Sequence, residues 1–204
     1  MGKVFLSENF VYLDDITHFQ EPMSKLKPIN LDNGVIRIHP LRISDIEREN
    51  EIIESLFEIL SDEENTKFIP EKRANDIKQI SMNMLGVTFR YTQELGYTHF
   101  ISLKESKEVI GQINIITPKG IEFESEYGIK DNWFIEYFLK KKYWGYGIMG
   151  GILTAVVLEM KKQGITNVCA VCYRENIASI KTLEKSGFIR VSEFDLKQDL
   201  YKLK

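Results

Sequence analysis

Residues 141–151 read KKYWGYGIMGG, and this glycine-rich stretch decides the fold prediction. Gly145, Gly147 and Gly150 are spaced as G-x-G-x-x-G, the pattern of a dinucleotide-binding turn. Such a turn needs a buried strand that runs directly into the first glycine. Here the charged letters KKKYW separate the apolar run WFIEYFL, residues 133–139, from Gly145. A nicotinamide-dependent oxidoreductase is therefore kept only as an alternative interpretation.

The same stretch still has the chemistry of an anion site. Glycines let backbone N–H groups approach a ligand closely. The start of the helix that follows supplies unpaired N–H donors and a positive dipole end. Lys140, Lys141 and Lys142 add positive charge beside it. The stretch predicts a phosphate-binding helix start, and the alternative is a closely packed helix start beside solvated lysines.

The composition is that of a soluble globular protein. The chain has 204 residues, of which 43% are hydrophobic and 28% charged, which is enough to build a sizeable core. A net charge of −3 argues against a dedicated nucleic-acid binder. No signal peptide is visible, and the longest apolar stretches are too short to span a membrane. We expect a cytoplasmic protein without nucleic-acid or membrane partners, either a monomer or a homodimer.

Two cysteines, Cys169 and Cys172, form a C-x-x-C pattern that is typical of redox and zinc sites. Their flanks, ITNVCAVCYREN, are β-branched and apolar and predict a strand. Residues three apart on a strand point to opposite faces, so these thiols cannot share a metal or form an easy disulfide. The sequence therefore predicts two buried structural thiols and no metal site.

Hydrophobic periodicity and the hairpins predict a mixed sheet and therefore an α+β or mixed α/β fold. Residues 1–30 are expected to form an N-terminal extension, and residues 31–204 the domain. Strand–helix–strand around the glycine stretch implies one parallel crossover. Pro118 is expected to end the preceding hairpin, and residues 119–132 are predicted as a loop or a ragged strand pair. Helices are expected over residues 45–60 (with Ser44 as N-cap), 74–94, 146–163 and 176–186.

A second motif gives the glycine stretch its context. The segment NIASIKTLEKSGF, residues 176–188, follows the pattern N-x-x-S…G-F, and YFLKKKYWGYG, residues 137–147, precedes it. Together they resemble the GNAT superfamily of acyl-CoA-dependent N-acetyltransferases, above all its ribosomal-protein N-terminal acetyltransferases. The resemblance covers roughly residues 33–195. It implies a central mixed, mostly antiparallel sheet of six to seven strands flanked by about four helices, with acetyl-CoA as co-substrate.

The resemblance also implies a binding site for coenzyme A. The strand before the glycine stretch and the strand after the helix should splay apart, and the pantetheine arm should pair with the backbone of residues 136–139. The N–H groups of residues 142–149 should hold the pyrophosphate. Asn176 would approach the pantetheine arm or act as a helix N-cap. The implied cofactor-binding residues are Tyr137, Phe138, Leu139, Lys142, Tyr143, Trp144, Gly145, Tyr146, Gly147, Ile148, Met149, Asn176 and Ser179.

Transfer to an amine requires a neutral nucleophile and therefore a base or a water chain. Glu136 is the one carboxylate in WFIEYFL and is the candidate base, because a central strand should desolvate it and raise its pKa. The alternative is a solvent-lined carboxylate that pairs with a lysine. Many superfamily members have a tyrosine acid where this chain has Leu183. The resemblance implies that Ser179 stabilises the leaving thiolate instead.

The acceptor is predicted only as a primary amine, on a small molecule, an aminoglycoside, a polyamine or a protein N-terminus. Four carboxylates form an acidic cluster in the sequence: Glu122, Glu124, Glu126 and Asp131. This cluster could attract a positively charged amine, or it could simply be a solvated loop. His39 and His99 are expected to be structural. A non-catalytic acyl-CoA-binding module is the other alternative to an enzyme.

Overall fold

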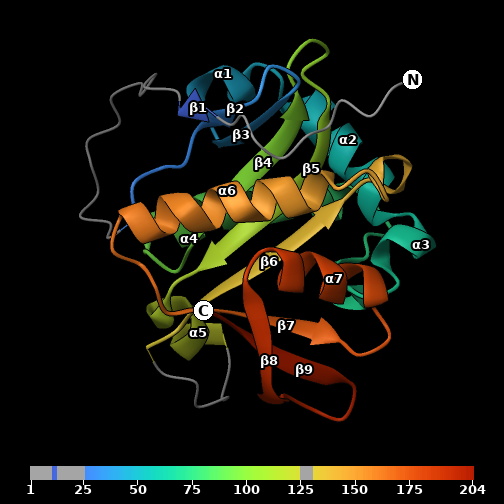
Figure 1. The fold of residues 1–204 in the computed structure, drawn as a ribbon. Coiled ribbons are helices and arrows are strands. Elements are labelled where there is room, and N and C mark those ends of the chain that lie inside the picture. The colour runs from blue at the N-terminus through green and yellow to red at the C-terminus, as the bar shows by residue number, and fades with distance from the viewer. Residues whose placement is uncertain (1–10, 13–25, 125–130) are drawn as a thin grey trace.

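The computed structural model describes residues 11–12, 26–124 and 131–204. Its strands, in chain order, are β1 (Val11–Tyr12), β2 (Leu31–Asp32), β3 (Ile36–Pro40), β4 (Gly96–Leu103), β5 (Val109–Ile116), β6 (Trp133–Leu139), β7 (Val168–Tyr173), β8 (Phe188–Glu193) and β9 (Gln198–Leu203). They form one sheet with the order β1-β2-β3-β4-β5-β6-β7-β9-β8 (Figure 1). Among these described strands only β6 and β7 pair in parallel, as the predicted crossover requires.

The helices are α1 (Ile43–Ile46), α2 (Glu49–Leu60), α3 (Glu63–Thr66), α4 (Ile77–Thr92), α5 (Pro118–Glu124), α6 (Ile148–Lys162) and α7 (Ile177–Lys185). Two short 3-10 turns are η1 (Pro70–Lys72) and η2 (Lys141–Tyr143). The mixed, mostly antiparallel α+β fold is confirmed. Strands β3 to β9 correspond to the six to seven expected. The additional elements, such as two-residue β1 and β2 and four-residue α1 and α3, are too short to give a periodic pattern.

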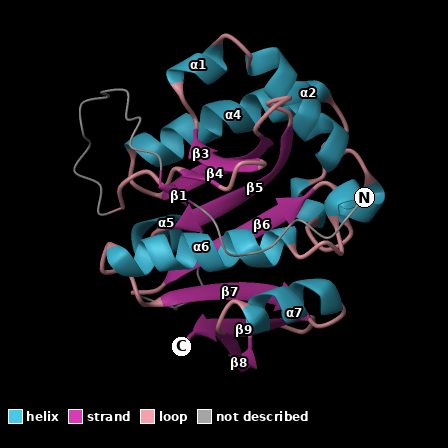
Figure 2. Ribbon diagram, turned by 45° about the horizontal axis from the view of Figure 1, so that its top comes forward, coloured by secondary structure: helices cyan, strands magenta, loops and turns pink. Residues whose placement is uncertain are grey.

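Helices cover both faces of the sheet (Figure 2). On one face α6 buries its apolar residues against Ile113 and Ile135 in the largest core cluster. On the other face α2 and α4 pack on Phe100 and Phe138. Each central strand is therefore buried on both faces, and successive side chains of β6 enter different cores.

The structure corrects two local predictions. Ser44 lies inside α1, and the helix expected over residues 45–60 begins only at Glu49. The segment after Pro118 does not begin as a loop or a strand pair, because α5 begins at that residue. Thr117 Oγ1 accepts a hydrogen bond of 2.9 Å from the Gly120 N–H, and proline at the first helical position needs no hydrogen-bond acceptor for its nitrogen. The pair Thr117-Pro118 is thus a helix start.

Cys169 and Cys172 are free, buried and on β7, as predicted. Cys169 packs in a small cluster with Phe134, whereas Cys172 belongs to the α6 core. The two thiols therefore face opposite sides of the sheet, and burial raises the pKa of each. Burial on opposite faces of the sheet fits the predicted structural role.

The N-terminal division at residue 30 stays a prediction, since residues 1–10 and 13–25 lie outside the described residues. Leu26 and Ile29 are fully buried in the same core as α6. None of the helices in the described ranges is both long and apolar enough to cross a membrane.

Candidate active site

The two parallel strands separate after a short contact. β6 and β7 pair only at Trp133 with Val168 and at Phe134 with Cys169, although both strands continue further. Figure 1 shows the two strands diverging from this point. The predicted splay is therefore present. A pocket of about 360 Å³ occupies it, lined by residues 134–137 of β6 and 170–173 of β7.

The pocket reaches both faces of the sheet. Ile135 and Leu139 pack with α6, whereas Phe134 and Phe138 pack in clusters on the other face. Because side chains alternate along a strand, Tyr137 lies on the α6 face and Glu136 on the face of α2 and α4. Two neighbouring residues thus present an acidic and a phenolic group to opposite ends of one pocket.

A hydroxyl pair lies at the α6 end. The Tyr137 hydroxyl is 2.9 Å from Ser179 Oγ. Ser179 is placed by Asn176, whose Oδ1 accepts a hydrogen bond of 3.1 Å from the Ser179 N–H and caps α7. Burial raises the pKa of Tyr137 far above that of a free phenol, although the hydrogen bond with Ser179 acts to lower it. The phenol is therefore neutral, and either hydroxyl of the pair can be the donor.

An ion pair lies at the opposite end. Lys72 Nζ, on η1, donates to Glu136 Oε2 at 2.7 Å, and both residues line the pocket. The side chains are 27% and 42% exposed, respectively. The desolvated carboxylate expected from the sequence is not found, and the lysine-paired alternative is the observed geometry. Glu136 nevertheless lines the pocket, and its carboxylate is paired there with the Lys72 ammonium.

The glycine stretch forms a tight turn into α6. Gly145 has φ +80° and Gly147, the N-cap of α6, has φ +74°, a region that glycine occupies without strain. Trp144 Nε1 donates to the carbonyl of Leu139 at 2.6 Å and fixes this turn to the end of β6. Among the described residues, no acceptor is found for the N–H groups of Gly145 and Gly147. These donors and the start of α6 form an anion-binding geometry.

The neighbouring lysines are partly neutralised. Lys140 donates to Glu58 and Glu108, and Lys142 also donates to Glu108. Burial acts to raise the pKa of Glu108, but the hydrogen bonds from the two lysines outweigh it and lower that pKa. The predicted positive charge beside the turn is therefore held in internal ion pairs, which fix the positions of the lysines.

The predicted cofactor-binding residues fall into three groups. Tyr137, Asn176 and Ser179 line the pocket together. Residues 142–147 form the turn outside the pocket lining, with Trp144 and Tyr146 exposed and Tyr143 partly buried under Lys142. The remaining four are buried in the cores: Phe138, Leu139, Ile148 and Met149. For this last group only backbone groups can contact a ligand.

Sequence reasoning missed several pocket residues that come from distant segments. Phe68 and Tyr173 lie with their ring centroids 6.0 Å apart and form an aromatic wall. Cys172, Phe194 and Gln198 also line the pocket. None of these residues belongs to the two motifs. The apolar pattern of β7 predicted only the strand that contains two of them, Cys172 and Tyr173.

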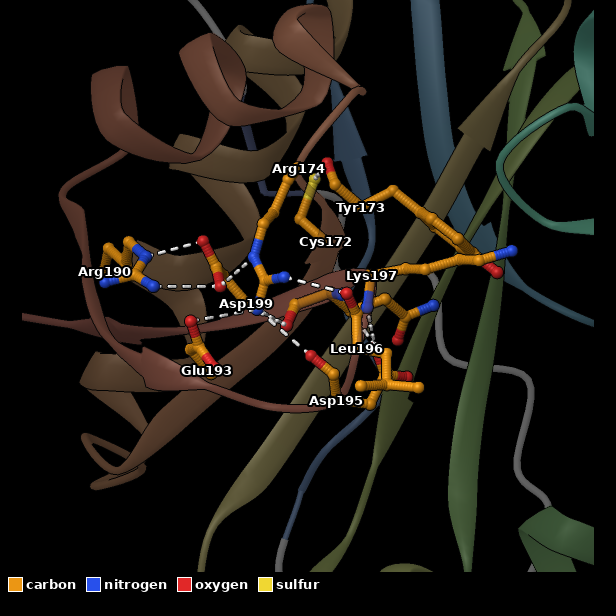
Figure 3. A network of polar contacts seen from close by, with 10 residues as sticks. Cys172, Tyr173, Arg174, Arg190, Glu193, Asp195, Leu196, Lys197 and Asp199 are labelled. Carbon is orange, nitrogen blue, oxygen red and sulfur yellow. Dashed lines mark hydrogen bonds and ion pairs between the residues drawn. The ribbon is translucent and has the colours of Figure 1, made fainter.

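A polar network holds the C-terminal part of this wall (Figure 3). Arg174, which follows β7, donates to Asp199 Oδ1 at 2.8 Å and to the carbonyls of Asp195 and Leu196. Arg190 donates to both oxygens of Asp199. The Arg190 hydrogen bonds and those of Arg174 hold the pKa of Asp199 at about 2. The network fixes the segment between β8 and β9.

Other predicted candidates lie away from the pocket. Glu122 and Asp131 are exposed and do not line it, and Glu126 and the side chain of Glu124 lie outside the described residues. His39 and His99 are buried, and burial lowers the pKa of each to about 4, which fits the predicted structural role. No group of three or more metal-ligating side chains occurs among the described residues.

Comparisons with known proteins give the family. The acetyltransferase (GNAT) domain matches residues 37–189, three quarters of the chain. No curated protein matches the chain. A ribosomal-protein-S5-alanine acetyltransferase from Vibrio fischeri superposes with a TM-score of 0.63 at 14% identity, covering 85% of this chain and 94% of that one.

Two further solved structures share the fold. The microcin C7 self immunity acetyltransferase MccE, in complex with acetyl-CoA and AMP, gives a TM-score of 0.64 at 16% identity over 83% of this chain and 92% of its own. AAC(6')-Ib, in complex with ribostamycin and coenzyme A, gives 0.61 at 17% identity over 82% and 91%. With the family match, these findings place the protein among the acyltransferases. The chain belongs to the GNAT family of acetyltransferases.

Proposed function

We propose that this protein transfers the acetyl group of acetyl-CoA to a primary amine by direct attack on the thioester. The observation that carries the proposal is the pocket between β6 and β7, which has Glu136 at one end and the Tyr137–Ser179 pair at the other. MccE, which has the same fold, was solved with acetyl-CoA, and AAC(6')-Ib with coenzyme A. Both support the choice of co-substrate.

The residues present fit coenzyme A. The N–H groups of Gly145 and Gly147 and the start of α6 suit a pyrophosphate. Beyond Phe134 the edge of β6 that faces the splay has no strand partner among the described residues, so its backbone can pair with an amide-containing arm. Asn176 and Ser179 line the pocket between these two regions. Acetyl-CoA supplies an activated thioester whose acyl group an amine can accept.

Each end of the pocket has a separate role in this proposal. Glu136 binds the acceptor ammonium and takes its proton, directly or through water, on the face of α2 and α4. Ser179, held by the Tyr137 hydroxyl, donates a hydrogen bond to the leaving thiolate on the α6 face. Because the two residues of β6 point to opposite faces, acceptor and coenzyme enter from opposite sides of the sheet.

The acceptor class is proposed as a primary amine on a polyamine, an aminoglycoside, another small molecule or a protein N-terminus. AAC(6')-Ib was solved with ribostamycin, and the Vibrio fischeri relative is a ribosomal-protein-S5-alanine acetyltransferase. A screen of acetyl-CoA consumption over these four classes identifies the acceptor. A rise in melting temperature with NADH but not with acetyl-CoA would favour an oxidoreductase instead.

The decisive variant is Glu136→Gln. We expect kcat with the best acceptor to fall by about 100-fold, since a positioned base contributes roughly that much or more, while acetyl-CoA still binds. Glu122→Gln, a change at an exposed carboxylate of α5 outside the pocket, is the matched control and should retain activity. Acetyl-CoA binding without turnover on any amine by the wild-type protein would favour a non-catalytic binding module.

A further inference from the structure

The acceptor end of the pocket contains a primary amine that belongs to the protein itself. Lys72 Nζ lies 2.7 Å from Glu136 Oε2, the carboxylate proposed to receive the acceptor ammonium. Both side chains line the pocket, on the face opposite the hydroxyl pair. The lysine therefore occupies the place where the proposed reaction needs an amine.

Ordered backbone holds Lys72 in this place. It ends η1, a turn in which the Lys72 N–H donates to the carbonyl of Ile69 at 2.9 Å and the Arg73 N–H to that of Pro70 at 3.2 Å. Glu136 is in the middle of a strand that is hydrogen-bonded to β5. The contact between the two side chains thus joins two fixed elements that are 64 residues apart in sequence.

Lys72 differs from the other lysines of the described chain. It is the only lysine among the described residues that lines the pocket. Lys140, Lys141 and Lys142, which are near the glycine turn, pair with glutamates outside the pocket. The two neighbours of Lys72 in sequence, Lys67 and Lys78, are exposed and do not line the pocket.

We propose that the protein acetylates its own Lys72 within one molecule when acetyl-CoA is bound and no other amine is present. The inference rests on the proposed function, because it uses the same pocket and the same carboxylate. An amine fixed beside the reacting group has an effective concentration far above that of a free amine in solution. Lys72 is therefore the first acceptor available to the thioester.

The reaction balances without a further reagent. The bond from Lys72 Nζ to the acetyl carbon forms and the carbon–sulfur bond of acetyl-CoA breaks. The nitrogen loses two protons in all. One goes to Glu136, which releases it to solvent, and the other goes to the leaving thiolate of coenzyme A. The product is a neutral amide, so the ion pair with Glu136 is lost and the carboxylate becomes available to another ammonium.

The test is to incubate the full-length protein with acetyl-CoA and no added amine, and to map acetyl-lysine by peptide mass spectrometry over time. Lys67 and Lys78 report on uncatalysed acetylation, which should favour them because they are more exposed than Lys72. We expect Lys72 to be acetylated at least about tenfold faster than either. The rate constant for acetylation of Lys72 should not change with protein concentration, because the transfer takes place within one molecule. Equal rates at the three lysines would overturn the proposal.

Variants separate this inference from the function that it rests on. Glu136→Gln should reduce acetylation of Lys72 to the rate of Lys67, and Lys72→Arg should abolish the modification at this position. In a mixture of the two variants, Lys72 of the E136Q protein should be acetylated no faster than in the E136Q protein alone, and faster acetylation in the presence of the K72R protein would refute transfer within one molecule. Turnover of an added amine without any acetylation of Lys72 overturns only this inference. Absence of both overturns the proposed function as well.

Discussion

In the proposed reaction, the chemistry on the α6 face depends on the hydrogen bond between Tyr137 and Ser179. The hydroxyls are 2.9 Å apart, and Asn176 fixes the backbone of Ser179. Because burial raises the pKa of Tyr137, the phenol is protonated at neutral pH. A serine hydroxyl held by such a phenol is oriented before the coenzyme arrives.

Tyr137→Phe removes this hydroxyl and keeps the buried ring. We expect kcat to fall by about 10- to 100-fold, since hydrogen bonds aimed at a developing negative charge act mainly in the transition state. Acetyl-CoA affinity should be nearly unchanged. Ser179→Ala should cost a similar factor, and the double variant little more, because the two residues act as a unit. Steady-state kinetics and calorimetric titration measure both quantities, and additive losses would contradict a shared role.

Single residues were predictable only where a motif contained them. Glu136 was identified as the one carboxylate of an apolar strand, and Ser179 by its place after Asn176. The side-chain role of Tyr137 was missed because its partner lies 42 residues away. Lys72 was missed because nothing near it in sequence distinguishes it from a surface lysine. Contacts between side chains from distant segments depend on how the strands are aligned in the sheet, and the local sequence pattern does not specify that alignment.

The start of α6 is the element that determines coenzyme affinity in the proposed function. Gly147 caps the helix at φ +74°, whereas Gly150 lies within its first turn at an ordinary helical conformation. A Cβ at either glycine would have no neighbour within 4 Å. The two positions therefore differ in backbone conformation and not in the space available.

Gly147→Ala should weaken acetyl-CoA binding, and Gly150→Ala is its matched control. An alanine in the left-handed region costs roughly 1–2 kcal/mol, so the turn should shift and the dissociation constant should rise by about 5- to 30-fold. Gly150→Ala should leave affinity unchanged or stabilise the helix slightly. Isothermal titration with acetyl-CoA and thermal unfolding compare the two. Equal affinities would show that the turn does not hold the pyrophosphate.

Elements with strong periodicity or caps were predicted well from sequence. The helix expected over residues 146–163 is α6, and the one expected over 176–186 is α7, each within two residues at both ends. The predictions failed where a short element depends on one cap, as at Thr117 before α5. A proline can end a strand or begin a helix, depending on the residue before it. Here the Thr117 hydroxyl caps the backbone that follows, so Pro118 begins a helix.

At the scale of the molecule, the proposed function depends on one break in a continuous sheet. The class of fold and the parallel crossover were predictable, because hairpin and helix periods alternate in the sequence. The splay was expected only from the resemblance to a family. The pocket wall was not predictable, because it joins η1, β7 and the network of Arg174, Asp199 and Arg190, which are far apart in the chain.

Two buried histidines make the stability of the whole domain depend on pH. The neutral His99 ring accepts a hydrogen bond from the Ile29 N–H at 3.2 Å, and His39 Nε2 lies 3.1 Å from Ser102 Oγ. Burial lowers both pKa values from 6.5 to about 4. As the pH falls, the unfolded chain therefore binds protons before the folded protein does. The contribution of the two neutral histidines to stability is complete above pH 6.5 and falls towards pH 4.

We expect a loss of up to ~3 kcal/mol per histidine across that range. Urea unfolding between about pH 7.5 and pH 5 measures the part of this loss that falls above pH 5, where carboxylates with ordinary pKa values stay ionised. His99→Gln keeps a hydrogen-bond acceptor for the Ile29 N–H but cannot titrate. The free energy of unfolding of this variant should therefore change with pH about half as steeply as that of the wild type. A wild-type free energy of unfolding that stays flat over this range would show that neither histidine remains neutral in the folded protein.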